Sequence, residues 1–407
     1  MSRRSSFGYS SYRPRSYRSG GYGGRRRKGG KSAVIAISII ALILIAAAVP
    51  AIYFAFMRDK GHEEIKEQTS TASSYENSLH EVSELSAASK EESAQSSAPE
   101  SSPDPDIEGY HDGNVFMYDR SGYEMFYGTD GSAQNYADIV SAVKAAVGKD
   151  VKVYNMVVPN HAPFGLPEKY LSQMNDEKEN IKKIYSSYTE DVTPIDVFAA
   201  ENDHRSEYTY FKTDHNWTAL GAYYAYQEFC KAANTKAIEL SSLSKGNITG
   251  FRGSLFAATR TDENPDGNKE LSANPDTVIY YNMPCIESCI LLENGKTEEQ
   301  EVPIIASFAE GSNSYSAFIW GNNPYMKVTT TQKTGRKLCI IKDSYGCAFA
   351  PFVTANYDEV FIVDPSFYEG NAAEYIINNK YTDVLIINSV MNANTSFKAN
   401  DIMTIIK

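Results

Sequence analysis

The sequence lacks the motifs of several common cofactor sites. It contains no phosphate-binding P-loop, no dinucleotide-binding glycine fingerprint and no histidine spacing typical of zinc hydrolases. Cys285 and Cys289 form a C-x3-C pair, but no histidine or second cysteine pair lies nearby to complete a zinc site. We therefore predict no metal and no nucleotide cofactor. The five cysteines are odd in number, so no disulfide framework is implied, and buried free thiols and one local bridge both stay open.

Residues 1–32 lack acidic side chains, and residues 33–57 lack charge. The first segment carries ten Lys or Arg among Ser, Tyr and Gly, which cannot build a core, so we predict a disordered cytoplasmic arm. The uncharged run of 24 residues from Ala33 to Phe56 spans roughly 36 Å as a helix, enough to cross a bilayer. We predict a transmembrane helix over 33–57; a signal peptide cleaved near Ala46–Ala48 is the alternative.

The next segment, 58–108, has a single aromatic residue, Tyr75, and is rich in Ser and Glu, which predicts a disordered linker. Because basic flanks stay in the cytoplasm, the chain is predicted to be a single-pass cell-membrane protein with its C-terminal domain outside. Of the 39 basic residues ten lie in the arm, so 29 face 51 acidic residues in the remainder. That balance argues against nucleic acid as a partner.

The segment 109–407 has the patterns of one extracytoplasmic α/β domain. Apolar residues spaced three and four apart predict helices over 132–148, 167–188 and 218–233. Short apolar runs predict strands over 151–159, 192–198, 337–342, 359–364 and 383–388. Strands this apolar are typical of a parallel sheet that is covered on both faces. Residues 235–330, with runs such as "DTVIYYN" and "SYSAFIW", predict a β-rich antiparallel insertion.

Two segments carry reactive side chains at positions that suit catalysis. Ser344 follows the predicted strand 337–342 and precedes a helix, and functional groups gather at the carboxyl ends of such strands. A serine hydroxyl needs a base within hydrogen-bond reach, and that base needs a carboxylate to orient it. "KTDHNWTALG" supplies both groups as Asp214 and His215, although Asn216 also suits a helix cap.

The order Asp, His, Ser carries a family resemblance. "YFKTDHNWTALGAYYAYQ" followed by "IIKDSYGCAFAPF" resembles the DHHW family, a bacterial group related to the SGNH-like domains of alginate O-acetyltransferases. The stretches "GSLF" at Gly253 and "FIWGNNP" ending at Pro324 are also similar. The resemblance implies a three-layer α/β/α, flavodoxin-like SGNH-hydrolase fold over 109–407. It also implies an O-acetyltransferase, or an esterase, that acts on a cell-wall or exported polysaccharide through a Ser-His-Asp triad, with a multi-pass membrane acyltransferase supplying the acetyl donor.

By position, the resemblance makes Ser344 the nucleophile and Asp214 the orienting carboxylate. The related acetyltransferases read Asp-x-His-Trp, and Asn216 stands here where their histidine does. An amide cannot accept a proton at useful pH, so His215, one residue earlier, is the predicted base. Two alternatives stay open: a triad that draws on His161 or His204, and a catalytically silent domain that binds glycan or scaffolds cell-envelope machinery.

Three further features mark candidate substrate-contacting residues. Asn160 and His161 follow the strand 151–159, where a substrate loop is expected. "WGNNP" resembles the Gly-Asn block that lends an oxyanion-hole amide in SGNH enzymes, which points to Asn322 or Asn323; a turn built from Asn and Pro is the alternative. Asp343 can belong to the nucleophile block, cap the following helix, or do both.

Overall fold

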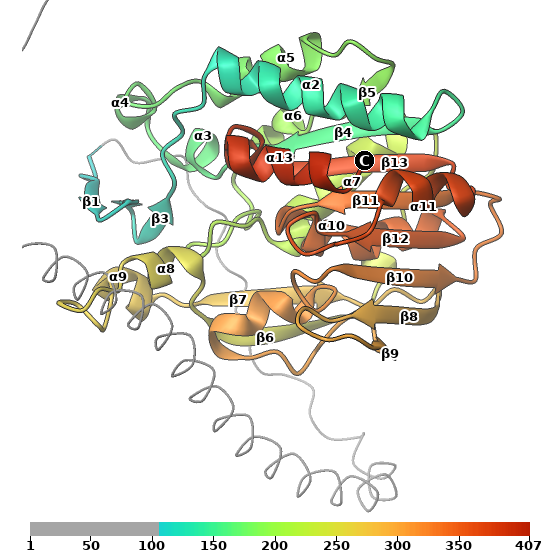
Figure 1. The fold of residues 1–407 in the computed structure, drawn as a ribbon. Helices are drawn as coiled ribbons and strands as arrows, with labels where there is room; N and C mark the ends of the chain where they lie inside the picture. The colour runs from blue at the N-terminus through green and yellow to red at the C-terminus, as the bar shows by residue number, and fades with distance from the viewer. Residues whose placement is uncertain (1–105) are drawn as a thin grey trace, which may run out of the picture. The chain divides into compact units, whose positions relative to one another are not determined.

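The computed structural model describes residues 106–407 (Figure 1). The predicted arm, the transmembrane helix and nearly all of the linker lie outside the described residues. Within 106–407, every helix is too short or too polar to cross a bilayer.

The domain is built on one large mixed sheet. The order of its strands is β5 (Val192–Pro194), β4 (Lys152–Val158), β13 (Asp383–Ser389), β11 (Lys337–Lys342), β12 (Glu359–Val363), β10 (Tyr325–Thr330), β8 (Ile286–Leu292), β9 (Glu299–Glu301). In this order, the first five strands (β5, β4, β13, β11 and β12) pair with their neighbours in parallel. The last three strands (β10, β8 and β9) continue the sheet from β12 in antiparallel pairs. This arrangement confirms the prediction of a mixed α/β fold around a largely parallel sheet.

Helices cover both faces of the sheet, because each central strand is apolar on both sides. In β11, Leu338 and Ile340 point to one core while Cys339 and Ile341 point to the other. All four side chains are fully buried, and burying each large one stabilises the fold by roughly 1.5–3 kcal/mol. The first core is closed by α7 (Ala219–Ala232) and α10 (Tyr345–Val353), and the second by α2 (Asp130–Val147), α5 (Glu177–Ser186), α11 (Ala372–Asn378) and α13 (Ser396–Thr404) (Figure 1).

One predicted helix is broken in two. The segment 167–188 forms α4 (Glu168–Leu171) and α5, separated by a turn. The side chain of Asp176 accepts a hydrogen bond from the backbone amide of Glu179, which starts α5 afresh. The apolar spacing continued across this turn, so the pattern alone did not reveal the cap.

The segment 235–330 is largely β-structure, but it does not form a separate layer. Its first two strands, β6 (Lys245–Phe251) and β7 (Asp276–Tyr281), make a small antiparallel sheet, whereas β8, β9 and β10 extend the main sheet. "SYSAFIW" is not a strand: it begins in the 3-10 helix η2 (Gly311–Ala317) and continues into a turn where Ile319 and Trp320 have φ of 47° and 65°. Left-handed backbone at two successive residues cannot continue a strand.

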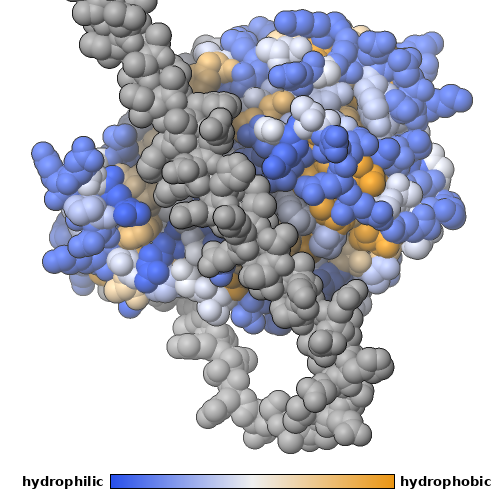
Figure 2. Space-filling view, turned by 60° about the horizontal axis from the view of Figure 1, so that its bottom comes forward, coloured by the Kyte–Doolittle hydropathy of each residue, from blue (hydrophilic) through white to orange (hydrophobic). Residues whose placement is uncertain are grey.

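The other elements are short and surround the carboxyl edge of the parallel strands or connect the main elements. They are β1 (Tyr110–Asp112), β2 (Val115–Tyr118), β3 (Ser121–Tyr123), α3 (Ala162–Gly165), α6 (Phe198–Asp203), η1 (Leu240–Ser242), α8 (Ser254–Ala258), α9 (Lys269–Ala273), η3 (Thr354–Asn356) and α12 (Val390–Ala393). All five cysteines are buried free thiols. On the face drawn in Figure 2, hydrophobic residues surface only in patches among hydrophilic ones.

Candidate active site

Ser344 sits in the turn between β11 and α10, at the carboxyl edge of the sheet. Its side chain is half-buried, and the turn is fixed by its neighbour Asp343. One carboxylate oxygen of Asp343 accepts the backbone amide of Tyr345 (3.0 Å), and the other accepts the backbone amide of Ser389 and the side-chain amide of Asn392 (both 2.8 Å). Asp343 thus braces the start of α10 against the end of β13. The hydroxyl of Ser344 is left free of any capping role.

Asp214 is held from two sides in the loop that precedes α7. One of its carboxylate oxygens accepts the backbone amide of Asn216 (2.9 Å), and the other accepts that of Ser254 (2.8 Å). Gly253 permits this close approach, because a Cβ there would lie 2.3 Å from Asp214. The cap of α7 is Thr218, whose hydroxyl accepts the amides of Leu220 and Gly221, so Asn216 is not the helix cap that its residue type suggested.

Asn216 lies between Asp214 and Ser344. Its side-chain nitrogen donates to the carboxylate of Asp214 (2.6 Å), and its carbonyl oxygen accepts the hydroxyl of Ser344 (2.8 Å). A carboxylate only accepts, so the amide must turn its NH₂ group to Asp214 and its oxygen to Ser344. The chain Asp214, Asn216, Ser344 therefore has the layout of a triad in which an amide occupies the place of the base.

His215 approaches the same hydroxyl from another direction. Its Nε2 lies 3.4 Å from the Oγ of Ser344, and its Nδ1 lies 2.5 Å from the Oγ of Ser254. The backbone amide of His215 also donates to Ser254 Oγ (3.2 Å), and its carbonyl accepts the hydroxyl of Tyr345. The imidazole is thus held at both ring nitrogens, and its ring is half-buried.

The two neighbours compete for the single proton of Ser344. With that proton donated to Asn216 at 2.8 Å, the serine oxygen can only accept from His215, which requires the proton of the imidazole on Nε2. The Nδ1 then accepts the hydroxyl of Ser254. For His215 to act as a base, the serine hydroxyl must rotate away from Asn216, and the imidazole proton must reside on Nδ1, facing Ser254.

Trp217 joins this loop to the helix that begins at Ser344. Its indole is fully buried, and its Nε1 donates to the backbone oxygen of Tyr345 (2.9 Å). The hydroxyl of Tyr315, in η2, donates to the backbone oxygen of Ser344 (2.9 Å). Three distant segments of the chain therefore converge on one turn, which gives the site a rigid frame.

Two carboxyl groups, the half-buried Glu124 and the buried Glu177, add to the electrostatics of the site. Burial raises the pKa of Glu124, the charge of an imidazolium at His215 acts to lower it, and Asp214 acts to raise it. Burial raises the pKa of Glu177 to about 8, although the backbone amide of Asn160 donates to it (2.8 Å). At pH 7, Glu177 is mostly protonated, so it adds little negative charge. No local sequence signal marks either residue.

The remaining candidates are held by other contacts. Asn322 accepts the amine of the buried Lys342 (2.7 Å), whose other partner is Asp364 (3.2 Å). The side chain of Asn323 accepts the backbone amide of Asn294 (3.0 Å) and donates to the carbonyl of Trp320 (2.9 Å). Both asparagine side chains thus build the loop beside Ser344 and make no hydrogen bond to it.

His161 and His204, the alternative candidates for the base, contact other side chains. The ring of His161 stacks on Tyr210 with centroids 5.1 Å apart, and that of His204 stacks on Tyr224 at 3.5 Å. His204 also pairs with Glu207 through its Nδ1 (2.7 Å). Among the histidines of residues 106–407, His215 is the one with a hydrogen bond to Ser344. Asn160 is buried next to Glu177, at the end of β4.

The backbone amide of Ser344 is a candidate donor to an oxyanion. The amide of Ser344 donates to no acceptor in the described part of the chain. It lies at the amino end of α10, where the helix dipole favours negative charge.

The sequence matches a known protein family and several solved structures. The family model described as "DHHW protein" matches residues 70–363. The chain belongs to the DHHW family. A crystal structure of a DHHW family protein from Eubacterium siraeum is 31% identical, covers 73% of this chain and 97% of its own, and superposes with a TM-score of 0.66. A search of curated proteins found no match.

One further solved structure shares the fold of this DHHW-family protein at lower identity. Bacillus cereus PatB1, solved with a sulfonyl adduct, is 17% identical over 72% of this chain and 98% of its own, with a TM-score of 0.57. The O-acetyltransferase domain of Pseudomonas putida AlgJ aligns with 12% identity over 73% of this chain and 99% of its own, with a TM-score of 0.39. The predicted family resemblance is therefore confirmed.

Proposed function

We propose that this DHHW-family protein is a membrane-anchored, extracytoplasmic O-acyltransferase, or an esterase, that acts on a cell-wall or exported polysaccharide. The observation that carries the proposal is the contact of His215 Nε2 with Ser344 Oγ at 3.4 Å. A serine hydroxyl beside an imidazole whose other nitrogen is held by a hydrogen bond is the arrangement that nucleophilic acyl transfer needs.

In the first half-reaction, Ser344 Oγ attacks the carbonyl carbon of the acyl donor. The serine proton passes to His215 Nε2, and a tetrahedral oxyanion forms. The amide of Ser344 and the amino end of α10 stabilise that oxyanion. When the donor's ester bond breaks, the imidazolium gives its proton to the departing oxygen, which leaves an acyl-serine and a neutral His215.

In the second half-reaction, a hydroxyl of the polysaccharide attacks the acyl-serine. Its proton passes to His215, the bond from the acyl carbon to Ser344 Oγ breaks, and the imidazole returns a proton to the serine. If water attacks in place of the sugar, the product is the free acid and the protein is an esterase. The balance between transfer and hydrolysis depends on how well bound glycan excludes water from the open site.

Ser254 and Asp214 position the base. When His215 acts as a base, its Nδ1–H donates to Ser254 Oγ, which lies in contact with that nitrogen. Asp214 fixes Ser254 through its backbone amide (2.8 Å). The carboxylate therefore acts on the imidazole through an intervening serine, and Asn216 takes the direct contact with Asp214 that a histidine at that position would take.

Membership of the DHHW family and the fold shared with PatB1 support an acyl-handling role, since PatB1 is described with a sulfonyl adduct. The predicted transmembrane helix over 33–57 would place the domain outside the cell. A multi-pass membrane acyltransferase is the expected source of the acyl donor.

The direct test is to incubate the full-length protein with an acetyl ester, measure turnover, and map any acetyl group by peptide mass spectrometry. We expect an adduct on Ser344 and loss of turnover in Ser344→Ala. Absence of an adduct together with unchanged turnover in Ser344→Ala would reject the proposal.

The hydrogen bond from Ser344 to Asn216 favours a second, non-catalytic function. Ser344 donates its proton to Asn216 at 2.8 Å, a shorter contact than the 3.4 Å to His215, and an amide cannot carry that proton away. A domain fixed in this state is catalytically silent, and it binds glycan or scaffolds cell-envelope machinery. Measurable glycan binding without any ester turnover in the wild type would favour this function.

A further inference from the structure

Strand β3 runs beside the loop that carries the acid and the imidazole of the candidate site. The backbone amide of Gly122, in the middle of β3, donates to the carbonyl of Lys212 (2.9 Å). Helix α8 is joined to the same loop, since the amide of Phe256 donates to the carbonyl of Thr213 (3.0 Å). The residue that follows β3, Glu124, is therefore held close to the start of this loop.

The side chain of Glu124 leaves β3 on the side of the candidate site. Consecutive residues along a strand point to opposite faces. The ring of Tyr123 packs on His161, with centroids 4.7 Å apart. A Cβ at Gly122 would lie 3.3 Å from the side chain of Leu255, so that face of β3 lies against α8. Glu124 follows Tyr123 and thus points the way Gly122 does, toward α8 and the loop bonded to it.

Glu124 is half-buried, and within residues 106–407 its carboxylate has no hydrogen bond and no ion pair. Burial raises its pKa, the charge of an imidazolium at His215 acts to lower it, and the weaker effect of Asp214 acts to raise it. Burial also raises the pKa of Tyr345, the residue after Ser344, and the charge of Glu124 raises it further. The carboxylate is therefore within electrostatic range of both sides of the site.

The neighbouring acid, Glu177, does not compete for the negative charge. Burial raises the pKa of Glu177 to about 8, the amide of Asn160 acts to lower it, and the charge of Glu124 acts to raise it. Glu177 is 1% exposed, whereas Glu124 reaches solvent. At pH 7 Glu177 holds a proton, so the negative charge of this pair of acids belongs to Glu124.

In the described part of the chain, no carboxylate contacts the imidazole of His215 directly. The carboxylate of Asp214 accepts from Asn216 and from a backbone amide of α8 instead. The titratable groups around the imidazole are Asp214 in its own loop, Tyr345 at the start of α10 and Glu124 after β3. The positive charge that His215 gains with the serine proton is stabilised by a nearby carboxylate, and Glu124 is the one left unpaired.

We propose that Glu124 is a positioning residue for the base, and that its carboxylate supplies the negative charge that stabilises the imidazolium of His215 during acyl transfer. This inference rests on the proposed function, because the imidazolium forms when Ser344 gives up its proton in that reaction. It adds a second acid to the site, one that acts on the imidazole through its charge.

The first test follows the charge of the imidazole without any ester substrate. The full-length protein is treated with diethyl pyrocarbonate from about pH 5 to 8, and modification of His215 is measured by peptide mass spectrometry. The reagent attacks an imidazole nitrogen that carries no proton, so the rate rises as the imidazolium loses its proton. Glu124→Gln removes the negative charge and should move the midpoint of this rise to lower pH by about half a unit or more.

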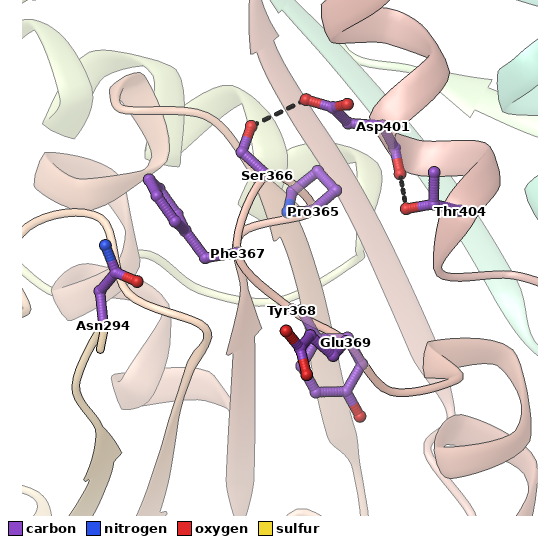
Figure 3. Close-up of a pocket in the computed structure, with 8 residues that line it drawn as sticks. All are labelled: Asn294, Pro365, Ser366, Phe367, Tyr368, Glu369, Asp401 and Thr404. Atoms are coloured by element: carbon purple, nitrogen blue, oxygen red, sulfur yellow. Dashed lines mark hydrogen bonds between the residues drawn. The ribbon is translucent and has the colours of Figure 1, made fainter. Parts of the chain in front are cut away.

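Two further variants serve as controls. Glu124→Asp keeps the charge on a shorter side chain and should restore most of the shift. Glu369→Gln makes the same chemical change at an exposed acid that lines a surface hollow after β12, where none of the lining residues belongs to the candidate site (Figure 3). It should give the wild-type midpoint.

The second test measures ester turnover and stability. Glu124→Gln should lower kcat by about threefold or more, the rate equivalent of half a pH unit, and leave KM unchanged. Its urea midpoint at pH 8 should be no lower than that of the wild type, because ionising a carboxyl whose pKa is raised by burial costs stability there. A lower urea midpoint would instead give Glu124 a structural role.

The two tests separate the inference from the proposed function. An unshifted His215 midpoint in Glu124→Gln, or equal shifts in Glu124→Gln and Glu369→Gln, would overturn the inference even if the wild type turns over esters at Ser344. If the midpoint shifts as expected but the wild type shows no turnover that depends on Ser344, the proposed function fails, and Glu124 remains the charge partner of His215.

Discussion

Replacing Asn216 with histidine should make proton transfer from Ser344 more efficient and so raise the rate of ester turnover. The Asn216 amide joins Asp214 (2.6 Å) to Ser344 (2.8 Å), so an imidazole there would receive orientation from the carboxylate and hold the serine hydroxyl. In the wild type, His215 lies at 3.4 Å, beyond the usual reach of about 2.6–3.2 Å for a general base.

The magnitude follows from the competition for the serine proton. Breaking the hydrogen bond to Asn216 costs about 1 kcal/mol, or roughly a fivefold loss of rate. The long distance from His215 Nε2 to Ser344 Oγ (3.4 Å) lowers the rate further. We therefore expect Asn216→His to raise kcat on a small acetyl ester by at least about tenfold, within the range of about 10²–10⁴ that a general base contributes.

The assay is initial-rate hydrolysis of p-nitrophenyl acetate, with the rate of Ser344→Ala subtracted. Asn216→Gln is the matched control, because it enlarges the side chain without adding a basic nitrogen, and it should not raise the rate. His215→Ala should cost about 10²-fold or more in the wild type but less than about tenfold in the Asn216→His background. The reasoning would be refuted if a folded Asn216→His protein were no more active than the wild type and if His215→Ala lost no activity in the wild-type background.

Three further predictions concern the support of the site. Ser254→Ala removes the hydrogen-bond partner of His215 Nδ1, so it should lower kcat by about 10- to 100-fold and shift the pH profile of the rate while leaving KM unchanged. Ser254→Thr keeps a hydroxyl at this position and should restore most of the rate. Glu177 binds a proton more tightly when folded (pKa about 8) than when unfolded, so its contribution to the free energy of unfolding should fall by about 1 kcal/mol per pH unit between pH 5 and 8. In urea titrations, Glu177→Gln should make the dependence of stability on pH less steep by that amount. If the two slopes are equal, Glu177 is not the titrating group. Gly253→Ala should displace Asp214 and reduce ester turnover by at least about tenfold, whereas the helix-start control Gly131→Ala, with only an ordinary contact at 3.7 Å, should retain it.

The central sheet was predictable because its strands are buried on both faces. The run 337–342 coincides with β11, and β12 and β13 differ from their predicted ranges by a single residue at one end. A continuous apolar run between polar turns leaves little choice of structure. The break between α4 and α5 was missed because a single side chain, that of Asp176, decides it.

The site could be predicted where its residues are adjacent in sequence or directly follow a predicted strand. Asp214 and His215 are adjacent, and Ser344 is marked by its place after a strand. Ser254 was missed as the partner of the imidazole, although "GSLF" was noted, because 39 residues separate it from His215 and no periodicity relates the two. Glu124 was missed for the same reason.

The left-handed turn at Ile319 and Trp320 also defied prediction. Both residues favour strands, and their backbone here is one that neither adopts readily. Tertiary contacts determine it: the indole of Trp320 donates to Pro303 (2.8 Å), and its carbonyl accepts the side chain of Asn323 (2.9 Å). At these two residues, tertiary contacts override the intrinsic preference for strand.

The rate at which a sulfonyl fluoride modifies Ser344 tests the proton transfer most directly, because sulfonylation needs the base but no glycan and no donor protein. The full-length wild type and His215→Ala are each treated with phenylmethylsulfonyl fluoride, and the adduct is followed by intact mass and located by peptide mapping. The account predicts an adduct on Ser344 in the wild type and a rate at least about 10²-fold lower in His215→Ala. Equal rates in the two proteins, or no adduct on Ser344 in the wild type, would contradict it.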